Sequence, residues 1–180
     1  MLLNDSIGTV HLKTEKLADV IRVFEAHASG VDRAFVAPPL GGWTALYPRE
    51  GDAARRWAEI ISRELKTTAV AFQVLEDEVF AYQLFTNGRL MDEFASKPAY
   101  FLGHDDEVDH DKIRALRGNP LAWEPFLVNG RQTTDIGKLL ASGFDDPRIV
   151  ARGGCDYLIP TTILEDLCRM IGIEGAAAGY

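Results

Sequence analysis

The chain has 180 residues, of which 47% are apolar and 26% are charged, and this composition excludes a disordered chain. Its formal net charge is -8. Binding to a phosphate backbone depends on clustered Lys and Arg, so we do not expect nucleic acid as a ligand. No run approaches the ~18 apolar residues of a membrane span, and the chain starts without an apolar leader, so we expect a cytoplasmic protein without membrane contact.

The first part of the chain predicts a strand, a helix, two strands and a second helix, before another strand follows. Thr14 and Asp52 are candidate N-caps of the two helices, because each precedes apolar residues at helical spacing. This is the ferredoxin-like order of elements, and it predicts an α+β fold with an antiparallel sheet. The expected spans are 7–12, 14–28, 34–37, 43–47 and 52–65.

Residues 65–94 predict three short strands joined by two turns. The first turn is acidic, and a three-residue loop at 76–78 would pair Leu75 with Val79. These strands extend the predicted sheet by a hairpin beyond the ferredoxin-like order.

The second turn is an Asn-Gly dipeptide at 87–88, the strongest local signal for a two-residue hairpin. A regular ladder on both sides of this turn pairs Phe85 with Leu90. Continued without interruption, the same ladder pairs Gln83 with Asp92.

This register assigns every side chain of the hairpins to one face of the sheet, since side chains alternate along a strand. One face is large and apolar, and we predict that it is the principal core face. The other face is lined by alanines, and we call it the alanine face. It also carries three polar side chains, Gln73, Gln83 and Asp92. The residues of the apolar face are Val70, Phe72, Val74, Phe80, Tyr82 and Leu84.

Two interpretations compete for the alanine face. In the first, the C-terminal helices or a second subunit pack closely on the alanines, and the glutamines bond to loop backbone groups. In the second, the alanines leave room for a small ligand that Gln73, Gln83 and Asp92 orient, since pockets are mostly apolar with a few convergent polar groups. The three residues are therefore the candidate ligand-binding residues of the chain.

The C-terminal part is predicted to be helices and loops, with apolar stripes at 136–143 and 162–172. We expect one α+β domain over 1–180. Its residues 1–101 would form the sheet with two helices, and residues 102–180 would form the helical and loop part of the same domain.

The segment HDDEVDHD at 104–111 is the densest group of carboxylates in the chain. It fails as a calcium loop because His110 stands where the sharp turn needs a glycine. Zinc or manganese held by His104, His110 and Asp111 is one interpretation, and a solvated acidic loop is the other. We favour the solvated loop and expect neither a metal nor a cofactor.

Catalytic signatures for phosphate, dinucleotide, zinc-protease, redox and hydrolase chemistry do not occur. Cys155 follows two glycines with no histidine close in sequence, so we expect a thiol that is not activated. The sequence identifies no catalytic residue, and we expect a non-enzymatic binding or interaction protein, such as an acidic regulator or an immunity-type partner. A protein partner or a second copy in a homodimer would then be its target. The alternative is a small-molecule-binding protein or small enzyme that uses the alanine face.

Overall fold

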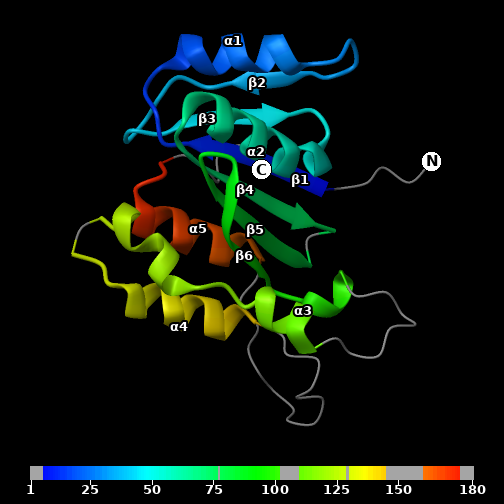
Figure 1. Cartoon of the computed structure of the whole chain (residues 1–180). Coiled ribbons are helices and arrows are strands. Elements are labelled where there is room, and N and C mark those ends of the chain that lie inside the picture. Colours follow the sequence, from blue (N-terminus) through cyan, green and yellow to red (C-terminus); the bar gives the residue numbers. More distant parts are fainter. Residues whose placement is uncertain (1–5, 77, 102–109, 129, 145–159, 175–180) are drawn as a thin grey trace.

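The computed structural model describes residues 6–76, 78–101, 110–128, 130–144 and 160–174. These residues form a six-stranded antiparallel sheet with the strand order β2-β3-β1-β4-β5-β6, and helices lie on both of its faces (Figure 1). The predicted α+β fold is confirmed, and the finer ferredoxin-like label stays a prediction. None of the described helices is long and apolar enough to cross a membrane.

The elements follow one another in chain order from β1 to α5. The strands are β1 (Ser6–Leu12), β2 (Ala34–Val36), β3 (Thr44–Pro48), β4 (Thr68–Leu75), β5 (Val79–Thr86) and β6 (Arg89–Ala95). The α-helices are α1 (Leu17–His27), α2 (Ala54–Leu65), α3 (His110–Ala115), α4 (Thr133–Gly143) and α5 (Pro160–Ile171). Three 3₁₀ helices connect them: η1 (Gly51–Ala53), η2 (Pro98–Tyr100) and η3 (Pro120–Phe126).

Both predicted N-caps differ from the observed helix starts. Helix α1 begins three residues after Thr14, whose hydroxyl instead accepts a hydrogen bond from the backbone N–H of Lys16 at 3.2 Å. Asp52 lies inside η1, and α2 starts without a side-chain cap. Helix α1 thus starts three residues after its candidate cap, and a 3₁₀ turn that begins at Gly51 leads directly into α2.

The first core lies between the sheet and helices α1 and α2. Trp57 of α2 is only 1% exposed, and its ring centroid lies 4.4 Å from that of Phe24 on α1. On the sheet side, Ala69 and Ala71 belong to the same cluster and leave space for α2 to approach. The predicted apolar stripe of α2 is confirmed by the burial of Ala54, Trp57, Ala58 and Ile61.

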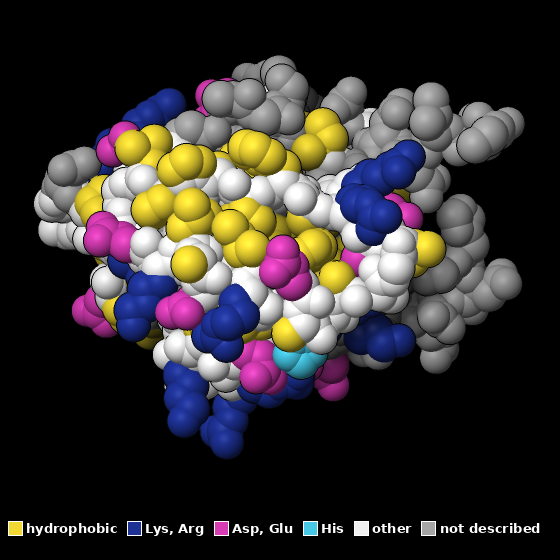
Figure 2. Space-filling model, turned by 90° about the horizontal axis from the view of Figure 1, so that it is seen from above, with side chains coloured by type: hydrophobic (Ala, Val, Ile, Leu, Met, Phe, Trp, Pro, Cys, Tyr) yellow, Lys and Arg dark blue, Asp and Glu magenta, His cyan; other side chains and the backbone are white. Residues whose placement is uncertain are grey.

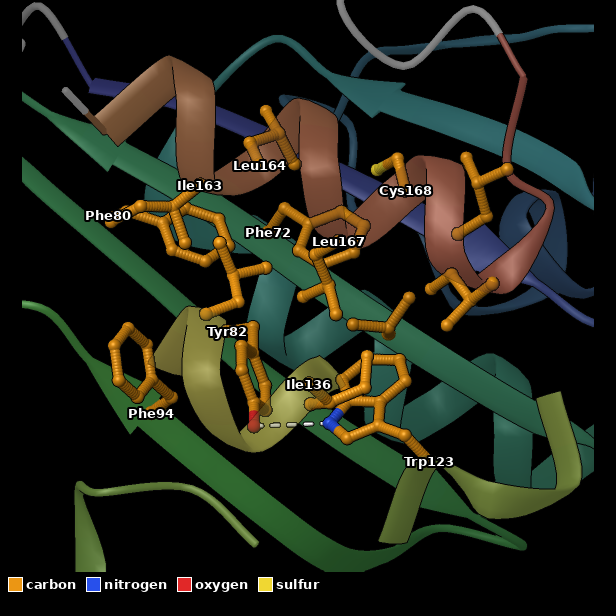
Figure 3. Packing of buried hydrophobic residues seen from close by; sticks show 14 of the residues in the cluster. Phe72, Phe80, Tyr82, Phe94, Trp123, Ile136, Ile163, Leu164, Leu167 and Cys168 are labelled. Atoms are coloured by element: carbon orange, nitrogen blue, oxygen red, sulfur yellow. Dashed lines mark hydrogen bonds between the residues drawn. The ribbon is translucent and has the colours of Figure 1, made fainter. Parts of the chain in front are cut away.

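The second core lies on the opposite face of the sheet, under η3, α4 and α5 (Figure 3). The predicted core face is confirmed, because Phe72, Phe80 and Tyr82 are fully buried in it. Tyr82 stacks on Phe94 with ring centroids 5.6 Å apart and meets the edge of Trp123 at 5.1 Å. The sheet therefore separates two cores, of which the second is the more aromatic.

The predicted strand register is confirmed along the whole acidic hairpin, but in the Asn-Gly hairpin it is confirmed only next to the turn. Across the Asn-Gly turn, Phe85 pairs with Leu90 as predicted. The register then shifts, so that Leu84 pairs with Asp92. The acidic hairpin matches the prediction throughout β4 and β5.

The predicted pairing of Gln83 with Asp92 is wrong, since Gln83 pairs with Glu93. The cause is a β-bulge in which Met91 has no counterpart on β5. One extra residue in a strand moves every later side chain to the other face of the sheet.

Candidate functional site

The structure does not bring the three predicted ligand-binding residues together. Gln73 and Gln83 lie on the α2 side of the sheet, whereas the bulge puts Asp92 on the side of the second core. The side-chain amide of Gln73 donates to the backbone oxygen of Gly51 in η1 at 3.3 Å. Gln83 is 6% exposed, and its amide oxygen has no hydrogen-bond partner among the described residues. The alanine face is thus closely packed, but η1 and α2 cover it rather than the C-terminal helices or the second subunit that the packed interpretation named.

Close packing at Gly8 shows how tightly η1 covers this face. A Cβ atom at Gly8 would lie 2.1 Å from the backbone oxygen of Gly51. Gly8 pairs with Gln73 across β1 and β4, so this contact sits directly beside the predicted polar group. A ligand at Gln73 would have to displace η1.

Asp92 belongs to a buried hydrogen-bond network on the opposite face. The Tyr82 hydroxyl donates to one carboxylate oxygen of Asp92 at 2.7 Å, and the backbone N–H of Asn119 donates to the other at 2.9 Å. The indole N–H of Trp123 donates to the Tyr82 oxygen at 3.1 Å, as drawn in Figure 3. Asp92 thereby holds the segment that enters η3 against β6, the edge strand of the sheet.

Burial sets the protonation of this network. It raises the pKa of Asp92 above its ordinary value, while the hydrogen bonds from Tyr82 and from the Asn119 backbone act in the opposite direction. Burial also raises the pKa of Tyr82 well above its ordinary value, and the neighbouring carboxylate of Asp92 adds to that effect. The Tyr82 hydroxyl therefore keeps its proton and remains the donor of the pair.

A cavity of about 370 Å³ opens beside this network, between α4 and the loop that leads from α3 to η3. We call it the α4 cavity. Most of its lining is apolar, and Arg117 supplies a positive charge. The lining residues are Arg117, Gly118, Pro120, Gly137, Leu140, Ala141 and Phe144.

Gly118 forms the wall between the α4 cavity and the buried network. Its φ of +72° lies in the left-handed region, which glycine adopts without strain. A Cβ atom here would lie 2.7 Å from the Tyr82 hydroxyl oxygen and 2.8 Å from a methyl carbon of Leu140. The backbone of Gly118 can therefore lie against Tyr82 only because it carries no side chain.

Two contacts fix Arg117 beside the cavity. Its guanidinium carbon lies 5.2 Å from the centroid of the Phe144 ring, a cation–π distance. Its backbone forms an isolated β-bridge with Phe94, next to a hydrogen bond from the Ala95 N–H to the Leu116 oxygen at 3.0 Å. The cavity is thus built against β6, on the opposite side of the sheet from the predicted site.

Sequence reasoning missed these residues because no motif marks them. The run Arg117-Gly118-Asn119-Pro120 carries turn residues, which predict a loop but not the neighbour of that loop. No family model, curated protein or solved structure matches the chain. The site therefore rests on geometry alone.

The other candidates from the sequence fall largely outside the described residues. His104 and Cys155 lie there, whereas Asp111 lies in the first turn of α3, which His110 begins. Within the described part of the chain, no group of three His, Cys, Asp or Glu side chains is arranged to hold a metal. Cys168 is buried in the second core, and burial, followed by the charge of Glu165, raises the pKa of its thiol.

Removing the Asp92 carboxylate should destabilise the protein. Asp92→Ala leaves the Tyr82 hydroxyl and the Asn119 N–H without their acceptor, and each unpaired buried group costs about 1–3 kcal/mol. Glu93→Ala is the matched control, because Glu93 is the adjacent carboxylate on β6 and is only half-buried. Urea denaturation measures both, and equal free energies of unfolding for the two variants would contradict the assigned network.

Proposed function

We propose that this chain is a non-enzymatic binding protein whose ligand is a small organic molecule seated in the α4 cavity. The observation that carries the proposal is the cavity itself, about 370 Å³ in volume and lined by apolar groups around Arg117. Small-molecule sites are typically concave spaces of roughly 300–1,000 Å³ with mainly apolar walls and a few polar anchors. The α4 cavity has this size and this composition.

The states of the buried titratable groups support binding rather than catalysis. His11 is 2% exposed, so its imidazole is shielded from a substrate, and the same burial lowers its pKa to about 4. Burial raises the pKa of Cys168, so its sulfur keeps the proton and is a poor nucleophile. The Asp92 carboxylate is committed to Tyr82 and to the Asn119 backbone.

A second candidate function, interaction with another protein, is supported by an apolar surface on the α1 side of the molecule. Figure 2 views this side and shows apolar side chains gathered over it. Ile21 of α1 is 37% exposed, and Val31 in the following loop is 78% exposed. Exposed apolar side chains that gather on one side of a molecule are a feature of protein interfaces.

Filling the α4 cavity should abolish ligand binding without unfolding the protein. Ala141→Trp places an indole into the cavity from an exposed position of α4. Lys138→Trp is the matched control, since Lys138 is exposed on the same helix and does not line the cavity. Thermal unfolding with naphthoate, a flat aromatic carboxylate, as the probe measures the effect.

The probe should stabilise the wild-type protein and Lys138→Trp by about 1.4 kcal/mol when its free concentration is ten times its Kd. It should leave the stability of Ala141→Trp unchanged. Equal stabilisation of all three proteins would place the bound probe elsewhere and would refute the proposed function.

A further inference from the structure

We infer that the outer edge of β2 binds an extended acidic segment of a protein partner, which adds to the sheet as a further strand. We call residues 33–37 the β2 edge. The inference is independent of the α4 cavity and goes beyond the proposed function. It follows from the backbone hydrogen bonds of β2, the exposed ring of Phe35 and two arginines beside that ring.

Two backbone hydrogen bonds fix how β2 faces its neighbour β3. β2 lies at one end of the described sheet (Figure 1). The N–H of Arg49 donates to the Arg33 oxygen at 2.8 Å, and the N–H of Ala37 donates to the Ala45 oxygen at 2.8 Å. In an antiparallel ladder every second residue bonds to the adjoining strand. Arg33 and Ala37 therefore face β3 with their backbone groups.

The same alternation turns the backbone of Ala34 and Val36 toward the outside. Phe35 lies midway between the two bonded positions and pairs with Tyr47, so its backbone also faces β3. Among the described residues, no backbone group of another segment bonds to Ala34 or Val36. These outward N–H and C=O groups are the ones that an added strand pairs with.

The side chain of Phe35 offers this added strand an apolar contact. Ala34 and Val36 pack against the first core, on the face that α1 and α2 cover. Side chains alternate along a strand, so Phe35 projects from the other face, where it is 65% exposed. Its ring centroid lies 6.1 Å from that of Tyr47. An aromatic or branched side chain opposite Phe35 would extend this row of rings.

Arg33 and Arg49 give the β2 edge a local positive charge. They lie directly opposite each other across β2 and β3, each two residues along from the Phe35–Tyr47 pair, and therefore share its face. The Arg33 guanidinium donates to two backbone oxygens, which carry no net charge. Within the described part of the chain, neither arginine forms an ion pair with a carboxylate.

The nearest carboxylate in the chain before β2 is already engaged. Asp32 accepts hydrogen bonds from the backbone N–H and the hydroxyl of Ser29 at 2.8 and 2.7 Å, and it pairs with Arg56. The formal charge of the whole chain is -8, but at physiological salt a charge acts over only about 8 Å. A segment at the β2 edge therefore meets the two arginines first, which favours an acidic segment.

A second copy of this chain fits the β2 edge less well. Residues 33–37 contain no carboxylate, so two β2 edges paired with each other would leave the arginines without acidic partners. Pro38 and Pro39 follow the edge and lack the N–H groups of a longer ladder. The segment that binds is therefore short, about five residues.

Amide NMR titrations with three capped peptides test the inference. The first peptide is Glu-Val-Trp-Val-Glu, which reads the same in both directions and places its tryptophan opposite Phe35. In the second, lysines replace the glutamates, and in the third the three central nitrogens of the acidic peptide are methylated. The proteins are the wild type, Phe35→Ala, Arg33→Gln and Arg49→Gln. Arg89→Gln is the control, since Arg89 is exposed on β6, at the opposite end of the sheet.

The acidic peptide should bind the wild type and Arg89→Gln equally and shift the amides of Ala34 and Val36 most. Each of Arg33→Gln and Arg49→Gln should bind it about 2- to 5-fold more weakly, as expected for one exposed ion pair. Phe35→Ala should bind it at least about 5-fold more weakly, because it removes the central aromatic contact. The lysine peptide should bind the wild type more weakly, and the methylated peptide should not bind.

Equal binding of the glutamate and lysine peptides would overturn the acidic partner, and undiminished binding of the methylated peptide would overturn strand addition. No binding of the acidic peptide to the wild type would overturn the inference as a whole. Sedimentation that shows a wild-type dimer, absent in Phe35→Ala, would assign the β2 edge to a second copy and overturn it as well. All of these outcomes leave the α4 cavity and its proposed ligand unaffected.

Discussion

Truncating Phe72 or Trp57 to alanine is expected to lower the free energy of unfolding by about 3–5 kcal/mol for each substitution, the range for large aromatic residues in cores. Phe72 is 0% exposed in the second core, and Trp57 is 1% exposed in the first. The two side chains lie on opposite faces of the sheet. Their substitutions therefore measure the two cores independently, and we expect their effects to add.

Phe35→Ala provides the matched control, because Phe35 lies on the same sheet but is 65% exposed. Its truncation should change the free energy of unfolding by no more than about 0.5 kcal/mol. Chemical denaturation of the three variants measures the comparison. A stability loss for Phe35→Ala that equals the loss for Phe72→Ala would contradict the assignment of the core.

Acidification should destabilise the folded protein through His11. Its side chain is 2% exposed and shares one hydrogen bond with the Thr9 hydroxyl at 3.2 Å. Its ring lies against the rings of Phe72 and Tyr47. Burial lowers its pKa from 6.5 to about 4 in the folded state. The unfolded chain therefore takes up a proton below pH 6.5, while the folded protein resists protonation until about pH 4.

Stability should consequently fall as the pH falls through this window, by a total on the order of 3 kcal/mol from this one group. The raised pKa of Asp92 makes the folded protein more stable as the pH falls, which partly offsets the effect of His11. The test therefore compares variants with the wild type at the same two pH values. His11→Gln should lose the His11 part of the decrease between pH 7 and pH 4.5. His27→Gln, which changes a half-exposed histidine at the end of α1, should retain it.

Denaturation curves of the wild type and both variants at the two pH values decide this prediction. An identical loss of stability on acidification in His11→Gln and in the wild type would show that His11 is not buried as the structure has it.

The features that sequence reasoning predicted correctly are governed by local patterns. The register of β4 against β5 follows from a short acidic loop between alternating strands, so Leu75 was correctly paired with Val79. The burial of Trp57 follows from the helical spacing of apolar residues in α2.

The features that the sequence did not reveal depend on single-residue irregularities and on contacts between distant segments. The bulge at Met91 needs no distinctive residue, yet it moves Asp92 from one face of the sheet to the other. The α4 cavity forms where a loop after α3 meets a helix that starts fifteen residues later, counting from Gly118 to Thr133. Periodicity within either segment carries no information about that contact.

The most direct test of the central claim, that the α4 cavity binds a small organic molecule, is an amide NMR titration of the wild-type protein with naphthoate. We expect the largest chemical-shift changes at the backbone amides of Arg117, Gly118 and Gly137 and at the Trp123 indole, which bonds to Tyr82 behind the cavity wall. Changes centred on Gln73 and Gln83, on the opposite side of the sheet, would contradict the account. An unchanged spectrum at saturating naphthoate would contradict it equally.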